Sequence, residues 1–181
     1  DLLLDTIERR ASHLALVHGD VRWTYAELGE HVHDIRQRIA RSGFRRGERV
    51  LLWLENSPRF VAAWIAVLAL RGVAVPLHAQ TPIAEVLRLL RNVSATGLVV
   101  SGATWMSSAG QILIENGCSQ TGLAAETEMR ESVADHLRFV LRADGVDVGV
   151  VDDARGLLSL RERDELLQGE LDAPLTREVL T

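Results

Sequence analysis

The chain has 181 residues, a net charge of −5 and 47% hydrophobic residues, which is the profile of a globular protein of one or two domains. All twenty basic residues are arginine, so no lysine of this chain can take part in phosphate binding or catalysis. The single cysteine, Cys118, excludes an internal disulfide and favours a reducing, cytoplasmic location. No face is basic enough to predict nucleic-acid binding. The longest apolar stretch, Phe60 to Leu70, is too short to span a bilayer.

The beginning of the chain predicts two short strands followed by a long helix. The strands are expected at residues 14–18 and 21–23, around a Gly-Asp turn. The helix is expected to start at Thr24, which forms a capping box with Glu27, and to stop at Gly43. Residues at spacings of three and four place one apolar face toward the core. These residues are Tyr25, Leu28, Val32, Ile35 and Ile39.

Three further strands are predicted at residues 49–54, 73–77 and 97–100, with helices between them. Ser57-Pro58 and Thr81-Pro82 each offer an N-cap followed by proline at the first helical position. The inner stripes expected for the two helices are Phe60, Val61, Trp64, Ile65 and Leu68, and then Ile83, Val86, Leu87 and Leu90. This alternation favours an α/β fold, a doubly wound and mainly parallel sheet flanked by helices.

Beyond Ser101 the pattern predicts helices at residues 105–115, 126–142 and 160–168, and a strand at 146–151. Residues 1–101 are therefore expected to form an α/β core, and 102–168 to continue the same subdomain. Residues 169–181 are expected to be an edge segment or linker. Because the chain starts without methionine, we also expect it to be a piece of a longer protein.

Several motifs carry a family resemblance. The two most telling are Trp23-Thr24-Tyr25-Ala26-Glu27-Leu28 and Arg71-Gly72-Val73-Ala74-Val75-Pro76-Leu77. Between and beyond them lie Gly47-Glu48-Arg49-Val50, Glu55-Asn56-Ser57-Pro58 and a stretch from Glu85 to Ser101. In this order and spacing, the set resembles the N-terminal portion of the adenylate-forming (AMP-binding) superfamily. Acyl-CoA synthetases, acyl-AMP ligases and the adenylation domains of nonribosomal peptide synthetases belong to it.

The resemblance implies a two-step reaction for a parent enzyme. A carboxylate attacks the α-phosphate of ATP, with Mg²⁺ present, and a thiol of CoA or of a carrier protein then displaces AMP. The implied partners are a carboxylic acid, CoA or an acyl or peptidyl carrier protein, and the remainder of the ligase polypeptide.

The family's phosphate loop and its catalytic lysine are absent from these 181 residues. No catalytic, cofactor-binding or metal-binding residue is therefore carried over, and the segment is expected to be an inactive scaffold. One alternative is a non-catalytic, ligase-like module that docks a carrier protein or a partner protein. Another is an unrelated doubly wound domain that binds a nucleotide or flavin. The sequence leaves open which acid is activated, which thiol accepts it, the oligomeric state, and whether the end at Thr181 is natural.

A few polar residues are candidate sites. Ser101-Gly102-Ala103-Thr104 follows a strand and precedes a helix, so it could cradle a phosphate, although its single glycine favours an ordinary turn. His78 follows a strand end, where ligands bind in such sheets, but a hydrogen-bonded loop histidine is the simpler interpretation. His31 and His33 do not share a helix face, which argues against a metal pair.

The remaining candidates also have simple structural interpretations. An arginine cluster is interpreted as a solvated face that complements the helix dipole, with a phosphate or an acidic carrier protein as the alternative ligand. The cluster comprises Arg36, Arg38, Arg41, Arg45, Arg46 and Arg49. Asp152-Asp153 is interpreted as a turn rather than a magnesium site, and Cys118 lacks an activating partner. Trp53 and Trp64 are predicted to be core residues.

Overall fold

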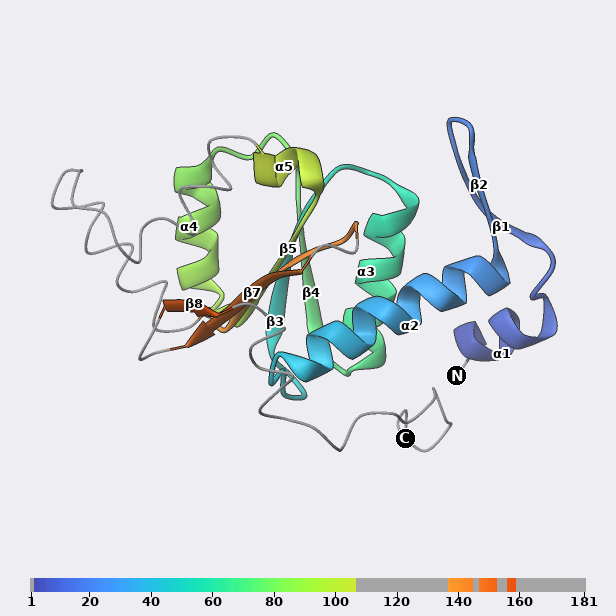
Figure 1. Ribbon diagram of the computed structural model, residues 1–181, viewed down its shortest axis with the longest axis horizontal. Helices are drawn as coiled ribbons and strands as arrows, with labels where there is room; N and C mark the ends of the chain where they lie inside the picture. Colours follow the sequence, from blue (N-terminus) through green and yellow to red (C-terminus); the bar gives the residue numbers. More distant parts are fainter. Residues whose placement is uncertain (1, 107–136, 145–146, 153–155, 159–181) are drawn as a thin grey trace, which may run out of the picture.

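The computed structural model describes residues 2–106, 137–144, 147–152 and 156–158. They form a six-stranded sheet flanked by helices, with a separate two-stranded hairpin near the N-terminus (Figure 1). The elements, in chain order, are α1 (Leu2–Arg9), β1 (Leu14–His18), β2 (Val21–Thr24), α2 (Tyr25–Arg41), β3 (Arg49–Trp53), α3 (Pro58–Ala69), β4 (Val73–Leu77), α4 (Ile83–Asn92), β5 (Gly97–Val100), α5 (Gly102–Met106), β6 (Phe139–Arg142), β7 (Asp147–Asp152) and β8 (Gly156–Leu158).

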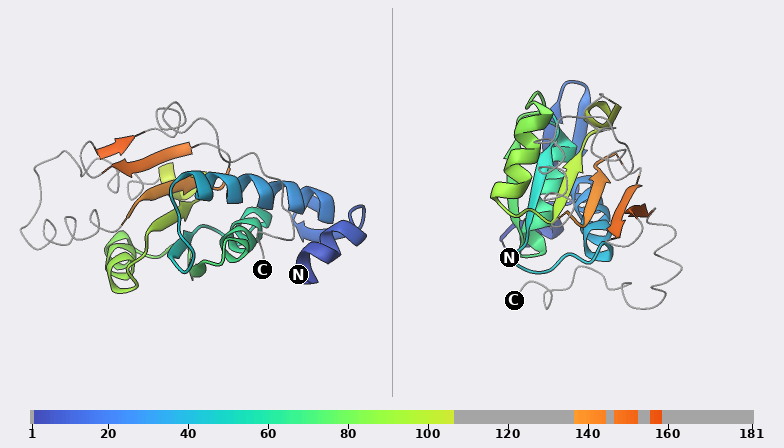
Figure 2. Two further views of the ribbon diagram at one scale, coloured as in Figure 1. Left: turned by 90° about the horizontal axis from the view of Figure 1, so that it is seen from below. Right: turned by 90° about the vertical axis from the view of Figure 1, so that its left-hand side faces the viewer.

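The large sheet has the strand order β4-β3-β5-β6-β7-β8. Strands β3 to β6 run parallel, whereas β7 and β8 are antiparallel additions. Helices α2 and α3 pack on one face and α4 packs on the other (Figure 2). The predicted doubly wound, mainly parallel fold is thus confirmed. We call the edge where β3 to β6 begin the amino edge, and the edge where they end the carboxyl edge.

Local capping signals determine where the first two long helices begin. The Thr24 N–H donates to Glu27 Oε2 at 2.7 Å and the Glu27 N–H donates to Thr24 Oγ1 at 3.2 Å, so the predicted capping box is present. Ser57 caps α3 by accepting from the Phe60 N–H at 3.2 Å. The expected repeat of this device at Thr81-Pro82 is wrong. Pro82 is itself the N-cap of α4 and makes no side-chain cap, because the proline ring has no atom that can accept a hydrogen bond.

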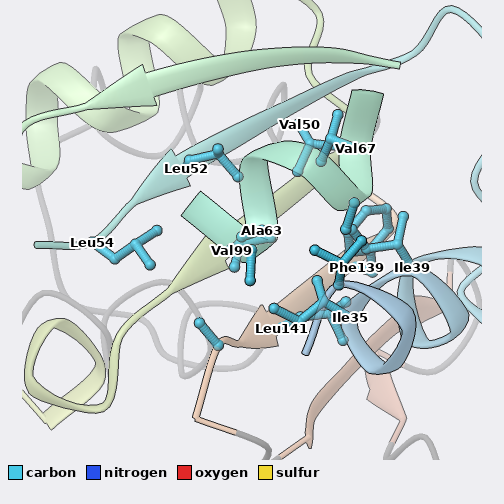
Figure 3. Close-up of a cluster of buried hydrophobic side chains, with 14 of the residues drawn as sticks. Ile35, Ile39, Val50, Leu52, Leu54, Ala63, Val67, Val99, Phe139 and Leu141 are labelled. Carbon is cyan, nitrogen blue, oxygen red and sulfur yellow. The ribbon is translucent and has the colours of Figure 1, made fainter. Parts of the chain in front are cut away.

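The larger core cluster lies between the sheet and helices α2 and α3 (Figure 3). Phe139 at the start of β6 is fully buried and stands opposite Gly97 in the parallel register of β5 and β6. A Cβ atom added to Gly97 would overlap the ring of Phe139. Glycine at this position therefore makes room for the aromatic ring, which fixes how β5 and β6 meet.

The predicted inner stripe of α3 is wrong for two of its five residues. Trp64 and Leu68 are 43% and 53% exposed, whereas Phe60, Val61 and Ile65 are half-buried and pack against the core. The helix instead buries its small side chains, which allow close packing against α2 and β3. The buried residues are Pro58, Ala62, Ala63, Ala66 and Val67. Because α3 is apolar on almost all sides, its periodicity does not choose between faces.

The other predicted stripes agree better with the structure. In α2, Leu28, Val32, Ile35 and Ile39 are buried, whereas Tyr25 is half-buried. In α4, Val86 and Leu90 are buried, and Ile83 and Leu87 pack against them.

The predicted helix at residues 126–142 is wrong at its C-terminal end, because Phe139–Arg142 is strand β6. The apolar run there is buried on both faces of the sheet, and a short continuous apolar run fits a buried strand as well as a helix. The strand expected at 146–151 is confirmed as β7. Residues 107–115 and 126–136, the helix expected at 160–168 and the linker at 169–181 lie outside the described residues.

Strand β4 ends the large sheet on one side, and Pro76 protects this edge. The Val73 N–H donates to the Glu48 carbonyl, so alternate residues of β4 point their backbone groups toward β3. The backbone groups of Ala74 and Pro76 therefore point away from the sheet, and Pro76 has no N–H to offer a passing strand.

Among the residues that the structure describes, no helix combines the length and the apolar character that a membrane span requires.

Candidate functional site at the carboxyl edge

The strand order reverses between β3 and β5. Strand β3 leads to β4 on one side, whereas β5 leads to β6 on the other. In open α/β sheets, ligands bind outside the carboxyl ends of the strands at such a switch point. Glu55 follows β3 and Ser101 follows β5, so these two residues mark the crevice in this chain.

Three side chains at the switch point are joined by hydrogen bonds. Ser101 Oγ donates to Glu55 Oε1 at 2.9 Å, and it lies 2.8 Å from Thr104 Oγ1. Since Ser101 has one hydroxyl hydrogen and Glu55 receives it, the Thr104 hydroxyl must donate to Ser101. The Thr104 N–H also donates to Ser101 Oγ at 3.0 Å. Ser101 thus caps α5 and links it to the end of β3.

Gly102 allows a second polar group to cover the same turn. A Cβ atom at Gly102 would lie 2.6 Å from Asp144 Oδ2 and 2.9 Å from an Arg142 guanidinium nitrogen. Arg142 and Asp144 form an ion pair here, with Arg142 Nε donating to Asp144 Oδ1 at 3.0 Å. The missing side chain of Gly102 lets this pair lie directly over the first turn of α5.

Two arginines from the helices hold the end of β6. An Arg38 guanidinium nitrogen of α2 donates to the Arg142 carbonyl at 2.9 Å, and one of Arg59 in α3 donates to the Ala143 carbonyl at 2.8 Å. Arg142 belongs to the last pair of β5 with β6, and Ala143 follows it directly. The contacts therefore join both helices to the carboxyl edge.

This arrangement does not fit ATP or Mg²⁺. The Thr104 N–H and the Ser101 hydroxyl already have partners, Arg142 is paired with Asp144, and the carboxylate of Glu55 would repel a phosphate. Within the described ranges, no three acidic, histidine or cysteine side chains are grouped closely enough to hold a metal ion. The side chains of the carboxyl edge position the turn that follows β5.

The structure gives His78 and His31 ordinary surroundings. His78 is exposed after β4, and its Nδ1 accepts from the Gln80 N–H at 3.2 Å. His31 stacks on Trp23 of β2, with ring centroids 4.0 Å apart and planes inclined by 21°. Burial lowers the pKa of His31, and the positive charge of Arg59 lowers it further, against weaker opposing effects of nearby carboxylates. His33 does not join His31 in any metal-binding group of the described residues.

The interpretation of the arginine cluster as a solvated face is wrong for two members. Arg36 and Arg38 are only 6% and 7% exposed, and burial lowers the pKa of Arg36. Arg45, Arg46 and Arg49 are exposed, as expected. The charge pattern gave no sign of this division, because the partner that binds Arg38 is a carbonyl 104 residues away in sequence.

The remaining candidates divide between described and undescribed residues. Trp53 is 2% exposed and confirmed as core, whereas Trp64 is largely exposed and its prediction is wrong. Asp152 ends β7. Asp153 and Cys118 lie outside the described residues.

Comparison with known proteins decides the family. A sequence model described as AMP-binding enzyme matches residues 3–147, well over half of the chain. The chain belongs to this family. Among similar AMP-binding proteins, one of the plipastatin synthase proteins of Bacillus subtilis is 26% identical over 160 residues, which cover 85% of this chain and 6% of that protein. The crotonobetaine/carnitine–CoA ligase of Citrobacter koseri is 31% identical over 99 residues, 54% of this chain and 19% of the ligase.

Solved structures of AMP-binding enzymes share the fold. An anthranilate CoA ligase in complex with anthranoyl-AMP superposes with a TM-score of 0.62 at 19% identity, covering 92% of this chain and 27% of the ligase. The N-terminal domain of FACL13 from Mycobacterium tuberculosis gives a TM-score of 0.62 at 18% identity, covering 97% and 37%. The chain thus covers between 6% and 37% of the length of these relatives. In the other direction, 97% of this chain superposes on the N-terminal domain of FACL13.

Sequence reasoning named Ser101, Gly102 and Thr104 but missed their partners. Glu55 stands in a run noted only for family resemblance, and Asp144 in no motif at all. Their position immediately after β3 and β6 was the available signal, because residues that follow parallel strands gather at the carboxyl edge.

Proposed function

We propose that this chain is the N-terminal scaffold of an ATP-dependent ligase that activates carboxylic acids. The parent enzyme would form an acyl-adenylate and then a thioester on CoA or a carrier protein. The observation that supports this proposal most strongly is the family match across residues 3–147. The described part of this region contains four parallel strands and the carboxyl edge that they form.

The 181 residues by themselves are proposed to be inactive. Phosphoryl chemistry needs fixed positive charge and a metal ion at the reacting phosphate. At the carboxyl edge the arginines are committed to carbonyls and to Asp144, and the chain has no lysine. ATP and Mg²⁺ would therefore be held by other parts of the parent enzyme. The single cysteine supports a cytoplasmic location as part of the same proposal.

The test is ATP–pyrophosphate exchange by the full-length gene product across a panel of fatty, aromatic and amino acids. Exchange that depends on one class of acid is expected, and no exchange with any acid despite an intact phosphate loop would overturn the proposal. For residues 1–181 alone we expect neither exchange nor ATP binding by calorimetry. Micromolar ATP affinity of this segment would contradict the scaffold role.

A second candidate is a non-catalytic, ligase-like module that docks a carrier protein or a partner protein. The exposed arginines Arg45, Arg46 and Arg49 favour it. The reading frame discriminates between the two, because a ligase must continue into a phosphate loop such as T-S-G-T-T-G-x-P-K. A stop codon directly after Thr181 in the natural gene would favour the docking module.

A further inference from the structure

The amino edge of the sheet carries a row of arginines assembled from three separate loops. The loops at residues 42–48, 70–72 and 93–96 precede β3, β4 and β5, and all three lie along the lower edge of the sheet in Figure 1. We define the basic row as five arginines in or near these loops. Its members are Arg45, Arg46, Arg49, Arg71 and Arg91.

Backbone hydrogen bonds hold the three loops together. The Gly47 N–H donates to the Arg71 carbonyl at 2.9 Å, and the Thr96 N–H donates to the Arg49 carbonyl at 2.9 Å. The strands that follow are neighbours in the order β4-β3-β5. At ~4.8 Å between adjacent strands, the row extends about 10 Å before the reach of the side chains is added.

The guanidinium groups of the basic row have no partners within the part of the chain that the structure describes. Four of the five side chains are exposed, and Arg71 is half-buried. The three loops contain one acidic residue, Glu48, and it forms an ion pair with Arg138. The row is therefore a local positive surface on a chain whose net charge is −5.

Two exposed apolar side chains flank the basic row. Leu68, near the end of α3, is 53% exposed, and Val73, at the start of β4, is 46% exposed. Both stand close in sequence to Arg71, which links α3 to β4. A surface that mixes guanidinium groups with aliphatic side chains fits a ligand that offers carboxylates beside an apolar stripe.

We propose that the basic row, with Leu68 and Val73, docks an acidic amphipathic helix of a partner protein. The Cβ atoms of residues i and i+4 of a helix are about 6 Å apart, which is close to the spacing of ~4.8 Å between the neighbouring strands that carry the arginines. The acidic remainder of the chain would repel a long polyanion beyond the row, which favours a compact acidic helix over a nucleic acid. This surface lies at the opposite end of the strands from the candidate site. The inference deepens the docking function proposed above as the second candidate, and it does not depend on the proposed ligase activity.

The direct test uses the 181-residue chain and a fluorescein-labelled helical peptide with glutamates at i and i+4 and leucines on one face. Fluorescence anisotropy at low salt should show saturable binding. Replacing the peptide's glutamates by glutamine should weaken it about tenfold or more, a loss of about 1.4 kcal/mol. Raising the salt to about 0.5 M should weaken it too, since exposed charges are screened.

Matched variants locate the surface. The double variant Arg46→Ser/Arg49→Ser should weaken binding about tenfold, because each of the two arginines would form an ion pair with one glutamate of the peptide. Arg10→Ser/Arg22→Ser removes the same charge from exposed positions near the hairpin and should leave the affinity within about twofold. Leu68→Ser should weaken binding without changing its salt dependence. Equal losses for the two arginine pairs would overturn the proposal, because net charge alone would then explain the binding.

Other occupants give different outcomes. Tighter binding of single-stranded DNA, or of vesicles containing phosphatidylserine, than of the acidic peptide would overturn the proposal. A further outcome tests the chain's own carboxylates as the occupant, with Glu126, Glu128 and Glu131 replaced by glutamine and Asp135 by asparagine. An increase of about tenfold in peptide affinity in this variant would overturn the proposal, because these carboxylates would then compete with the peptide for the basic row. An absence of saturable peptide binding at millimolar concentration would overturn it as well.

Discussion

At the carboxyl edge of the sheet, Arg38, Arg59 and Arg142 each bind another part of the chain, whereas at the amino edge Arg46 and Arg49 extend into solvent. The difference follows from what surrounds each guanidinium group. At the carboxyl edge the last carbonyls of β6 need donors, while at the amino edge Glu48 and Arg138 satisfy each other. The same residue type therefore ties one edge together and leaves the other edge charged for contact with other molecules.

The largest effect should come from breaking the packing that supports the amino edge. Phe139→Ala removes a fully buried ring that stands against Gly97 and should destabilise the chain by about 3–5 kcal/mol. Urea unfolding followed by circular dichroism measures this change. Gly97→Ala should cost about 1–3 kcal/mol, since the new methyl group overlaps the ring. If the two losses add fully in the double variant, the ring and the glycine are not in contact as described.

The next effect concerns the ion pair that neutralises Glu48. Glu48→Ala leaves the partly buried Arg138 without its carboxylate and removes an acceptor for the Thr96 hydroxyl and the Arg45 N–H. We expect a loss of about 2 kcal/mol in the free energy of unfolding.

The matched control is Glu85→Ala, which removes the exposed partner of Arg88. Exposed ion pairs contribute little, so this loss should be clearly smaller. If Glu48→Ala and Glu85→Ala lower the free energy of unfolding equally, the Glu48–Arg138 ion pair does not stabilise the amino edge more than an exposed ion pair would.

A smaller effect is expected at the carboxyl edge. Ser101→Ala removes the cap of α5 and the link to Glu55, at a cost of about 1 kcal/mol. Hydrogen exchange should become faster at the Thr104 amide. Ser101→Thr keeps a hydroxyl and should retain the protection, whereas unchanged exchange in the alanine variant would remove Ser101 from the network.

The smallest effect concerns the pH dependence at His31, whose pKa is influenced by Arg59 of the carboxyl edge. Because the pKa of His31 is lowered in the folded state, its contribution to stability is complete above the unfolded value of about 6.5 and decreases as the pH falls below it. Arg59→Gln should raise the pKa of His31 toward that value but not restore it, since burial is the larger cause. NMR titration of the imidazole measures the shift, and a pKa unaffected by the substitution would show that Arg59 is not a close neighbour.

The sequence predicted most strands and helix starts correctly because these depend on neighbours in the chain. Thr24 with Glu27 and Ser57 with Pro58 act within one helical turn, and apolar runs of four or five residues are enough to predict β3, β4 and β5. Motif order also gave the family, which the match over residues 3–147 confirmed.

Contacts between distant segments decided the rest. The side chains of Trp64 and Leu68 are as apolar as those of α3 that are buried, and only close packing against α2 and β3 selects the small ones. Burial of Arg38 depends on the Arg142 carbonyl, and the bonds of Ser101 depend on Glu55. By itself, the sequence determined the local elements and the family of this protein. Tertiary structure determined which faces are buried and which arginines remain exposed, because these depend on partners that only folding brings together.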